Sequence, residues 1–374
     1  MRFTVSSTAL SSRLVALSRV INSKNSLPIL GDFLFEVVDG RLNLTASDSE
    51  VMMKTSIDLT DNDGNGRFCV GNHDLLEAVK GISEQPITFD VDQTANIAKI
   101  GYQNGMFSLP VESADEFPQP QQIGEGANVI NIATATLAEN INRSIFATAQ
   151  DELRPVMNGI YFDLTPDYLA IVASDGHKLV RNKVLNVKSE QPAAFILPKK
   201  PAALLKGVLG KQGGDVVIRF DERNAEINFE EGTIICRLIE GRYPNYNSVI
   251  PTDNPFRVIA DRLAFISALR RVSVFASQSS SLIKLHVDQG TLTVSAQDLD
   301  FSTSAEEHIM CEYDGTAMSI GFNGPFLLDV LNSITSNDIV LELADPSRAG
   351  VITPAEQEEN EDLIMLLMPM MLKD

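Results

Sequence analysis

Tryptophan is absent from this chain of 374 residues, and cysteine occurs only three times, as Cys69, Cys236 and Cys311. Three cysteines that lie far apart, without a CxxC pair, argue against a disulfide framework and against a structural zinc site. Because an unpaired cysteine usually behaves as a small hydrophobic residue, we expect free, buried thiols in a reducing compartment.

The chain also lacks a long hydrophobic run and a secretion signal. Its most apolar stretch, residues 363–372, is interrupted by Pro369 and is too short to span a bilayer. Residues 1–12 contain an isolated Arg2 and no continuous apolar segment, so they do not resemble a signal peptide. We therefore expect a soluble, cytoplasmic protein.

Catalytic motifs are scarce as well. The sequence contains no Walker loop, GxGxxG or HExxH pattern, and we predict neither a cofactor nor a metal site. Only one segment brings a serine, an acid and a histidine together, as Ser174, Asp175 and His177. A hydrolase that uses these residues is the alternative hypothesis. A structural turn is the favoured interpretation, because a triad is defined by spatial roles rather than by adjacency in sequence.

A threefold internal repeat is the main feature that the sequence does contain. An alternation of apolar residues ends in an aspartate at Asp48, Asp175 and Asp298, and these aspartates are 127 and 123 residues apart. A leucine near the start of a helical segment recurs at a similar step, as Leu10, Leu137 and Leu263. This step is the length of a small domain, so the sequence predicts three tandem copies of one domain.

Each copy shows the same order of strand-like and helix-like segments. In the first copy, Leu10, Leu14, Leu17 and Ile21 predict one apolar stripe along a helix. The pattern predicts an α+β domain in which an antiparallel sheet carries two helices on one face. Linker-like composition near residues 119–128 and 250–255 predicts domains at residues 1–124, 128–249 and 250–374.

The charge is unevenly distributed. The formal net charge is −20, which by itself argues against a polyanionic partner. However, residues 1–31, 191–214 and 262–287 together hold 12 of the 30 lysines and arginines and none of the 50 acids. Each window includes a predicted helix, so we expect basic helix faces that contact phosphates without reading sequence. Simple solvation of these faces is the alternative explanation.

Six motifs give the whole chain a resemblance to a known family. They are MRFTV at 1–5, LPILG at 27–31, ASDGHKL at 173–179, EGRYPNY at 240–246, GFN at 321–323 and MPM at 368–370. In order and spacing they resemble the bacterial DNA polymerase III beta subunit family, the sliding clamps. The resemblance implies a non-catalytic, head-to-tail homodimeric ring around duplex DNA, with the sheets outside and two helices per domain inside. It also implies the replicative polymerase, the clamp loader and other proteins with a clamp-binding motif as partners.

The resemblance further implies a hydrophobic peptide-binding pocket between the second and third domains. The matching positions are Met157, Ser174, Gly176, His177, Lys178, Leu179, Pro244, Val249, Leu367, Met368, Pro369, Met370, Met371 and Leu372. Unbranched methionine side chains suit a surface that adapts to several partners. The chain departs from many relatives at Ser248 and Ser280 and in its ending Met371-Leu372-Lys373-Asp374, so its preferred peptide can differ.

Two further sets of residues are implied for the ring. The residues predicted to face DNA, from charge pattern or family position, are Arg19, Lys24, Lys199, Lys200, Lys206 and Arg271. The dimer seam is predicted to pack Phe107 and Leu109 of one chain against Val274 and Phe275 of the other. The acidic segment 353–362, near the pocket, is expected to be a solvated loop.

Overall fold

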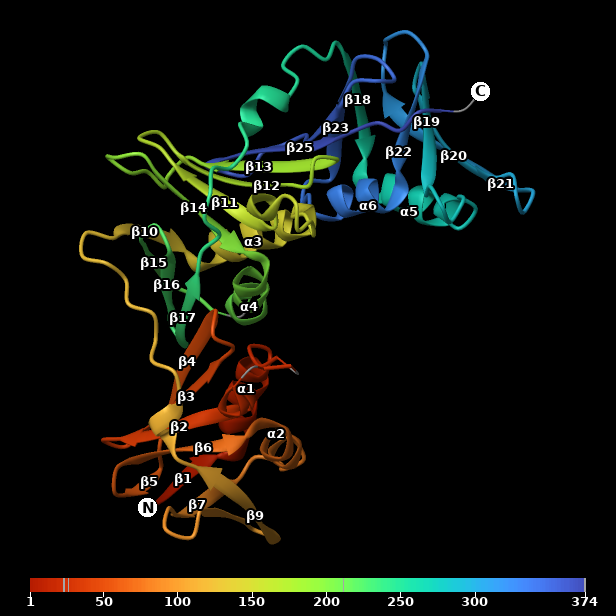
Figure 1. Cartoon of the computed structure of the whole chain (residues 1–374). Helices are drawn as coiled ribbons and strands as arrows, with labels where there is room; N and C mark the ends of the chain where they lie inside the picture. The colour runs from red at the N-terminus through yellow and green to blue at the C-terminus, as the bar shows by residue number, and fades with distance from the viewer. Residues whose placement is uncertain (23, 26, 211, 373–374) are drawn as a thin grey trace. The chain divides into compact units, whose positions relative to one another are not determined.

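The computed structural model describes residues 1–22, 24–25, 27–210 and 212–372 (Figure 1). Lys211, which contributes to the second basic window, lies outside the described residues, as do Lys373 and Asp374. The chain divides into two compact units. Unit 1 comprises residues 1–138 and 200–238, and unit 2 comprises residues 139–199 and 239–374. No helix among the described residues is long and apolar enough to cross a membrane.

The order of elements repeats three times. The first copy contains β1 (Arg2–Ser6), α1 (Ser7–Ser18), β2 (Asp32–Val38), β3 (Arg41–Ser47), β4 (Val51–Asp58), β5 (Asp61–Asp63), β6 (Gly66–Gly71), α2 (Asn72–Lys80), β7 (Pro86–Asp92), β8 (Ile97–Tyr102) and β9 (Gly105–Glu112). The second contains β10 (Asn128–Ala133), α3 (Thr134–Ser144), β11 (Gly159–Leu164), β12 (Leu169–Ser174), β13 (Lys178–Val184), β14 (Ala193–Pro198), α4 (Lys199–Leu209), β15 (Asp215–Phe220), β16 (Asn224–Phe229) and β17 (Gly232–Arg237). The third contains β18 (Phe256–Asp261), α5 (Arg262–Ser273), β19 (Leu282–Asp288), β20 (Thr291–Asp298), β21 (Thr303–Glu312), β22 (Met318–Asn323), α6 (Gly324–Asn332), β23 (Asp338–Leu343), β24 (Gly350–Pro354) and β25 (Glu361–Leu367).

Unit 1 contains a 13-stranded sheet with the order β10-β15-β16-β17-β4-β3-β2-β6-β9-β8-β7-β1-β5. The first and second copies meet in this sheet, where β17 pairs antiparallel with β4 and Ile234 lies opposite Met53. We call this strand pair the first junction. Because both side chains are buried, the pair extends the core as well as the hydrogen-bonded ladder.

Unit 2 contains a 12-stranded sheet with the order β14-β11-β12-β13-β25-β24-β23-β18-β21-β20-β19-β22. Here the second and third copies meet, because β13 pairs antiparallel with β25 and Val180 lies opposite Met365. We call this strand pair the second junction. The two junctions use equivalent strands, since β4 and β13 each directly follow the aspartate turn of their copy.

The helices pack on their sheets in side-by-side pairs. α1 lies beside α2 in unit 1 and α5 lies beside α6 in unit 2, as Figure 1 also shows. In α1, Leu10, Leu14 and Leu17 are fully buried, whereas the helix ends at Ser18. The prediction that Ile21 continues the helical stripe is therefore wrong.

The helix starts show a second difference from the sequence prediction. Leu10 and Leu137 lie four positions after the residue that precedes their helix, and both are fully buried. In α5 that position is Phe265, which is also fully buried, whereas Leu263 is 59% exposed. Leu263 is thus not the structural counterpart of the other two leucines, because residues two positions apart in a helix lie on nearly opposite faces.

The three repeated aspartates form the same turn. Asp48 Oδ1 accepts the backbone N–H groups of Glu50 and Val51. Asp175 accepts those of His177 and Lys178, and Asp298 accepts those of Asp300 and Phe301. A short carboxylate that binds the backbone two and three residues ahead explains why aspartate recurs at this position. The predicted turn chemistry is confirmed in all three copies.

The described cysteines are free, as predicted. Cys69 and Cys236 are buried, and burial raises the pKa of each thiol to about 12. Cys311, on β21, is partly exposed, so the expectation of burial is wrong at that position. A thiol with so high a pKa is protonated at neutral pH and unreactive, which fits a packing role for the two buried residues.

Candidate peptide-binding and nucleic-acid surfaces

The turn at residues 174–178 has structural rather than catalytic geometry. Ser174 Oγ donates to the carbonyl oxygen of Lys178 at 2.9 Å, and Lys178 Nζ donates to Asp175 Oδ2 at 2.5 Å. Burial alone would raise the pKa of Asp175, but hydrogen bonds from Lys178 and His177 hold it below its usual value. His177 is exposed, and the structure gives its ring no hydrogen bond to Ser174 or Asp175. These contacts do not form a nucleophile–base–acid relay.

Lys178 is held from two sides. Besides its ion pair with Asp175, its Nζ lies 3.8 Å from the centroid of the Phe326 ring in α6. Its side chain is only 6% exposed, so the contact with the ring face stabilises a largely desolvated cation. Sequence reasoning selected Lys178 and missed Phe326. The signal was available, because Phe326 follows the GFN motif at 321–323 by only three residues.

The C-terminal strand lies along this turn. In β25, Leu366 is opposite Leu179 and Leu367 is opposite Lys178. The chain then continues past the turn, where the backbone N–H of Met368 donates to the carbonyl of His177 at 2.8 Å. Two residues later, the N–H of Met370 donates to the carbonyl of Gly321 at 2.7 Å. Residues 368–370 thus connect the edge of the second copy to β22 of the third.

A buried apolar cluster packs beneath the surface formed by the turn and the C-terminal strand. Leu179 and Leu366 belong to it together with Ala349, Tyr243 and Tyr246, and Val156 packs against it. The Tyr243 ring stacks on the Tyr161 ring, with centroids 4.6 Å apart. The hydroxyl of Tyr246 donates to Asp163 Oδ2 at 2.9 Å. These contacts fix the segment 239–250 against the sheet of the second copy.

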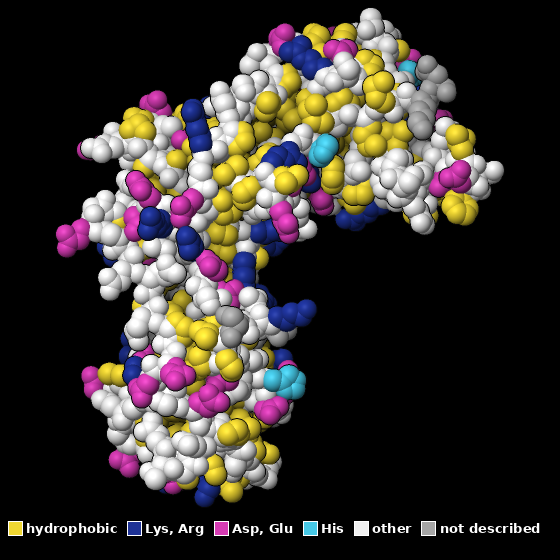
Figure 2. All heavy atoms as spheres, in the orientation of Figure 1, with side chains coloured by type: hydrophobic (Ala, Val, Ile, Leu, Met, Phe, Trp, Pro, Cys, Tyr) yellow, Lys and Arg dark blue, Asp and Glu magenta, His cyan; other side chains and the backbone are white. Residues whose placement is uncertain are grey.

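The predicted pocket residues therefore come from four segments that meet in unit 2. Met157 is buried in the short helix Pro155–Met157, whereas Val249 is 56% exposed and Pro244 is also exposed. Met368 is 42% exposed and Met371 is 84% exposed. Figure 2 shows hydrophobic side chains gathered at the surface over the region of β13 and β25. Exposed apolar side chains and a buried apolar cluster thus lie together in this part of unit 2.

Lys200 makes several contacts within the protein. Its Nζ donates to the carbonyl of Val20 at 2.6 Å, to Asn22 Oδ1 at 2.8 Å and to Asp48 Oδ2. The carboxylate of Asp48 is only 5% exposed, so the ion pair is partly desolvated. Lys200, in the second copy, thereby binds the first copy beside the first junction. The prediction that it faces DNA did not foresee these partners.

The other predicted DNA-facing residues fall into two groups. Lys24, Arg19 and Lys206 are exposed, and Lys199 is half-buried. The guanidinium of Arg19 lies over Gly207 of α4, so close that a Cβ at this glycine would clash with Nη1. Arg271, in contrast, makes a two-point ion pair with Glu307, with both N–O distances 2.6 Å. Its positive charge is already partly neutralised within the chain.

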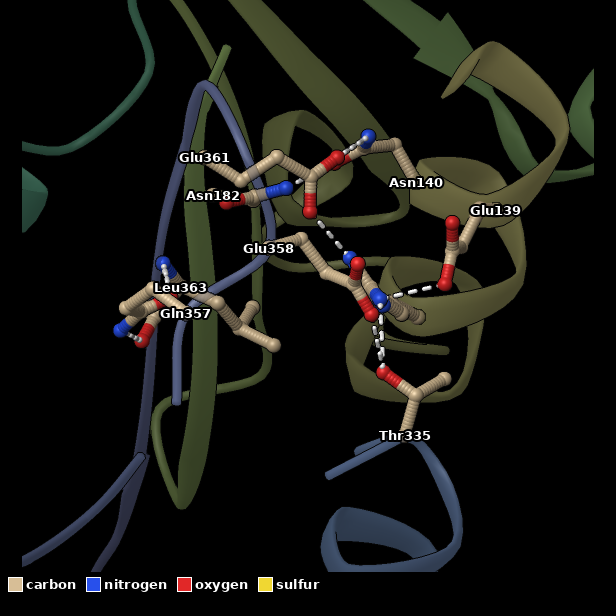
Figure 3. A network of polar contacts seen from close by, with 9 residues as sticks. Glu139, Asn140, Asn182, Thr335, Gln357, Glu358, Glu361 and Leu363 are labelled. Atoms are coloured by element: carbon tan, nitrogen blue, oxygen red, sulfur yellow. Dashed lines mark hydrogen bonds and ion pairs between the residues drawn. The ribbon is translucent and has the colours of Figure 1, made fainter. Parts of the chain in front are cut away.

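A buried polar network was not foreseen from the sequence. Arg143 of α3 is 2% exposed and forms ion pairs with Glu361 at the start of β25 and with Glu139 (Figure 3). Thr335 accepts a hydrogen bond from Arg143 at 3.4 Å and donates one to Glu358 at 2.8 Å. Asn140 connects Glu361 to Asn182 of β13. This network lies beside the second junction, as Lys200 lies beside the first.

The acidic segment 353–362 is therefore not simply a solvated loop. Glu361 is 7% exposed in its ion pair with Arg143, and Asp362 pairs with Arg181 at 2.7 Å. Gln357 exchanges hydrogen bonds with the backbone of Leu363. The expectation failed because an acid-rich run looks the same in sequence whether its charges face water or basic side chains of another domain.

The predicted seam residues lie at the surface of their units. Val274 is 78% exposed and Phe275 is 39% exposed at the end of α5. Phe107 and Leu109 are half-buried on β9, and the Phe107 ring lies 6.3 Å from that of Tyr102. All four apolar side chains are thus at least partly accessible at the surface.

Comparison with known families explains the threefold repeat. The family models for the N-terminal, central and C-terminal domains of the DNA polymerase III beta subunit match residues 1–121, 131–245 and 247–370. The chain belongs to the DNA polymerase III beta subunit family. The predicted family and the α+β fold of three tandem clamp domains are confirmed. The boundaries 1–124, 128–249 and 250–374 stay predictions.

Individual clamps support this membership over the whole chain. The beta sliding clamp of Pseudomonas aeruginosa is 29% identical over 374 residues, with 100% of each chain covered. A crystal structure of the P. aeruginosa sliding clamp bound to griselimycin superposes with a TM-score of 0.93, at 28% identity and full coverage of both chains. The beta subunit from Thermotoga maritima gives a TM-score of 0.89 at 26% identity, again over both full chains.

Membership in the clamp family gives the chain the function of a sliding clamp for DNA polymerase III. Clamps are processivity factors without catalytic activity, so the prediction of a non-enzymatic role is confirmed and the hydrolase alternative has no support. In this clamp, Ser174, Asp175 and His177 form a structural turn at the edge of β13.

Proposed function

We propose that two copies of the chain close head to tail into a ring around duplex DNA. The observation that carries this proposal is a pair of unused strand edges. Residues 105–110 of β9 pair only with β8, and residues 303–310 of β21 pair only with β20, among the described residues. The equivalent strands are paired on both sides at the first and second junctions. If β9 of one chain paired with β21 of another, the backbone N–H and C=O groups of both open edges would gain hydrogen-bond partners.

The same proposal gives a reason for the exposed apolar groups. Phe107 and Leu109 lie on the open edge of β9, and Val274 and Phe275 lie at the end of α5, which packs on β21. In a head-to-tail dimer these four side chains would meet at each of two identical seams. A heterologous contact that closes after two copies makes a ring and leaves no free edge.

Duplex DNA is the proposed cargo of the ring. Lys24, Arg19 and Lys206 carry exposed charges, and we include Lys199, Lys200 and Arg271 with them as residues that face DNA. Lys200 and Arg271 are expected to contribute less, because each already binds a carboxylate of the chain. Contacts of this kind act on phosphates, depend on salt and do not read bases.

We also propose that the surface of unit 2 binds a short hydrophobic peptide from the replicative polymerase, from the clamp loader and from other partners. The support is the junction of four segments around the cluster that contains Leu179 and Leu366. Met368 and Met371 remain exposed there, and an unbranched thioether adapts to peptides of different shape. The residues proposed for this surface are the fourteen named from the sequence, with Phe326 added beneath Lys178.

Retention on circular DNA tests the ring. After loading by a clamp loader, the protein should stay on nicked circular DNA through gel filtration and should be lost once the DNA is linearised. The reason is that a ring is held by topology rather than by affinity. Equal loss from circular and linear DNA would contradict the proposal. The variants Lys24→Glu and Lys199→Glu should each load less well, whereas Lys188→Glu, outside the basic windows, serves as a charge-matched control.

Peptide binding tests the second surface separately. Deletion of residues 370–374 should reduce the affinity for a fluorescent peptide from a polymerase tail by at least about tenfold, since it removes part of the apolar contact area. Leu153→Ala, which truncates a side chain that is 91% exposed, is a control outside the proposed surface. Unchanged binding after the deletion would rule out the assignment of the C-terminal residues.

A further inference from the structure

Residues 368–372, which we call the tail segment, are bonded to the rest of unit 2 at two points. The backbone N–H of Met368 donates to the carbonyl of His177, and that of Met370 donates to the carbonyl of Gly321. The second contact is an isolated bridge to β22, the strand at the end of the 12-stranded sheet. Because this bridge is not continued by a ladder, side-chain packing around it has to hold the tail segment in place.

Gly321 lets the tail segment approach β22 closely. A Cβ at this glycine would lie 2.7 Å from the carbonyl oxygen of Met370, 2.8 Å from Leu282 Cδ1 and 2.9 Å from Leu372 Cδ2. These separations are well inside van der Waals contact, which for two carbon atoms is about 3.5–4.0 Å. Gly321 does not have a positive φ, so its backbone conformation does not require glycine. The missing side chain instead leaves a niche on β22, where the end of the Leu372 side chain lies.

The other two copies carry side chains at the equivalent position. Two residues before the end of β6 and β14 lie Cys69 and Ile196, as Gly321 lies two residues before the end of β22. Both side chains are buried in apolar clusters. The chain crosses the strand there as well, because Cys69 pairs with Glu112 and Ile196 accepts the backbone N–H of Ile239. The repeated fold therefore tolerates a side chain at this position, and the glycine of the third copy is explained by the tail segment that lies over it.

Side chains of the tail segment alternate between β22 and solvent. Met370 and Leu372 are half-buried, whereas Met371 between them is 84% exposed. Neighbouring side chains of an extended chain point to opposite sides, so the contact of Leu372 with the niche turns Met371 outward. Met371 is one of the two exposed methionines of the proposed peptide-binding surface.

We infer that Gly321 is a positioning residue for this surface, because its niche holds Leu372 and fixes the tail segment with Met371 facing outward. The inference rests on the peptide-binding function proposed above and adds a residue outside the set named for it. Without the niche, the tail segment would have to become ordered when a peptide binds. The conformational entropy lost in that step would lower the affinity for the peptide.

Peptide affinity tests the inference through a double-mutant cycle. Gly321→Ala should raise the dissociation constant of a fluorescent peptide from a polymerase tail about five- to tenfold. After deletion of residues 370–374, the same substitution should change the constant less than about twofold, because the segment that it displaces is absent. An equal loss in both backgrounds would overturn the inference, since Gly321 would then act through the rest of the domain.

Gly101→Ala is the matched control. Gly101 also lies inside a strand, β8, and a Cβ at this position would have no neighbour within 4 Å. Because Gly101 does not have a positive φ either, alanine should fit there and change the dissociation constant less than about twofold. A loss as large as that of Gly321→Ala would contradict the role of the niche.

The order of the tail segment can be measured without any peptide. A nitroxide spin label at Met371→Cys, in a Cys311→Ser background, reports the mobility of the segment by electron paramagnetic resonance. Cys69 and Cys236 should not take up the label, because both are buried and burial raises the pKa of each thiol to about 12.

Gly321→Ala should make the label more mobile and Gly101→Ala should not. Leu372→Ala, which empties the niche without a change in β22, should also make the label more mobile and serves if Gly321→Ala fails to fold. Unchanged mobility in these two tail variants would overturn the inference. If the parent protein bound no peptide while the mobility still depended on Gly321, the proposed peptide binding would be wrong and the ordering of the tail segment by the niche would stand.

Discussion

The first and second junctions use equivalent strands but different polar contacts. At the first, Lys200 is 32% exposed and binds Asp48, Asn22 and Val20. At the second, Arg143 is 2% exposed and binds Glu361 and Glu139. The strand pairing is common to both and therefore belongs to the repeated fold. The polar contacts differ in residue type, position and burial, so each junction acquired its own.

Burial predicts that the two junctions differ in their sensitivity to substitution. A buried cation that loses its partner cannot be hydrated, whereas a partly exposed one can. The unpaired edges of β9 and β21 are a third case, because the ion pair described on β21, between Glu307 and Arg271, is exposed rather than buried. A seam without a buried ion pair suits a contact between separate chains, because no charge has to be removed from water when the two surfaces meet.

The largest expected effect is at the second junction. Arg143→Ala should destabilise unit 2 by about 3–5 kcal/mol, because Glu361 would remain buried without its cation. Urea unfolding would measure the shift, and Arg143→Met/Glu361→Met should recover much of it by removing both charges. The control Arg154→Ala breaks an exposed pair with Asp151 and should cost at most about 1 kcal/mol. Equal effects of the two single substitutions would show that burial does not distinguish these pairs.

Next in size is the effect at the open seam. Phe275→Asp should shift the protein to monomers at micromolar concentration, since it places a charge in an apolar contact. Size-exclusion chromatography with light scattering would measure the shift. The fold of the monomer should be unchanged, as judged by circular dichroism, because Phe275 is 39% exposed. A stable dimer of this variant would contradict the seam.

A smaller effect is expected at the first junction. Lys200→Ala should lower the stability of unit 1 by about 1–2 kcal/mol, the usual range for a charged hydrogen bond that is partly hydrated. Lys24→Ala should leave stability unchanged, because the described residues include no ion-pair partner for Lys24. Retention on circular DNA should fall for Lys24→Ala. If Lys200→Ala left thermal stability unchanged, its contacts would not hold the first junction.

The smallest effect concerns pH and lies away from both junctions. Burial and the nearby Glu112 carboxylate raise the pKa of Asp32 to about 6, above its usual value of 3.8. The folded state thus binds the proton more tightly than the unfolded state, so this group favours folding below about pH 4 and loses that contribution as pH rises through 6. Asp32→Asn should therefore raise the melting temperature at pH 8 by a few degrees and change it little at pH 4. The opposite pH dependence would contradict the assignment.

Local sequence patterns predicted much of the fold. Three aspartates at a constant step predicted three equivalent turns, because an Asp side chain can satisfy the backbone two and three residues ahead. Leu10, Leu14 and Leu17 predicted the buried face of α1 for the same kind of local reason. The prediction failed at the end of this helix. Ile21 fits the helical spacing but lies beyond Ser18, and helix ends depend on contacts that the period does not encode.

The candidate surfaces were only partly accessible to this reasoning. The resemblance located Lys178 and the C-terminal methionines, but not the ring of Phe326 beneath Lys178. From charge and family position, Lys200 and Arg271 were predicted to face DNA. In the structure, Lys200 binds a carboxylate 152 positions away and Arg271 binds one 36 positions away. Pairing between residues so distant depends on how the copies pack, and a single sequence carries no direct record of it.

The sequence by itself determined that one α+β domain occurs three times, since periodicity and turn chemistry act over a few residues. Tertiary structure decided how the copies join. It paired β4 with β17 and β13 with β25, buried Arg143 against Glu361, and left one edge of β9 and one edge of β21 largely unpaired among the described residues. Repetition makes the copies alike because the same local forces act in each. Their contacts differ because a strand edge gains a partner only where another copy lies beside it.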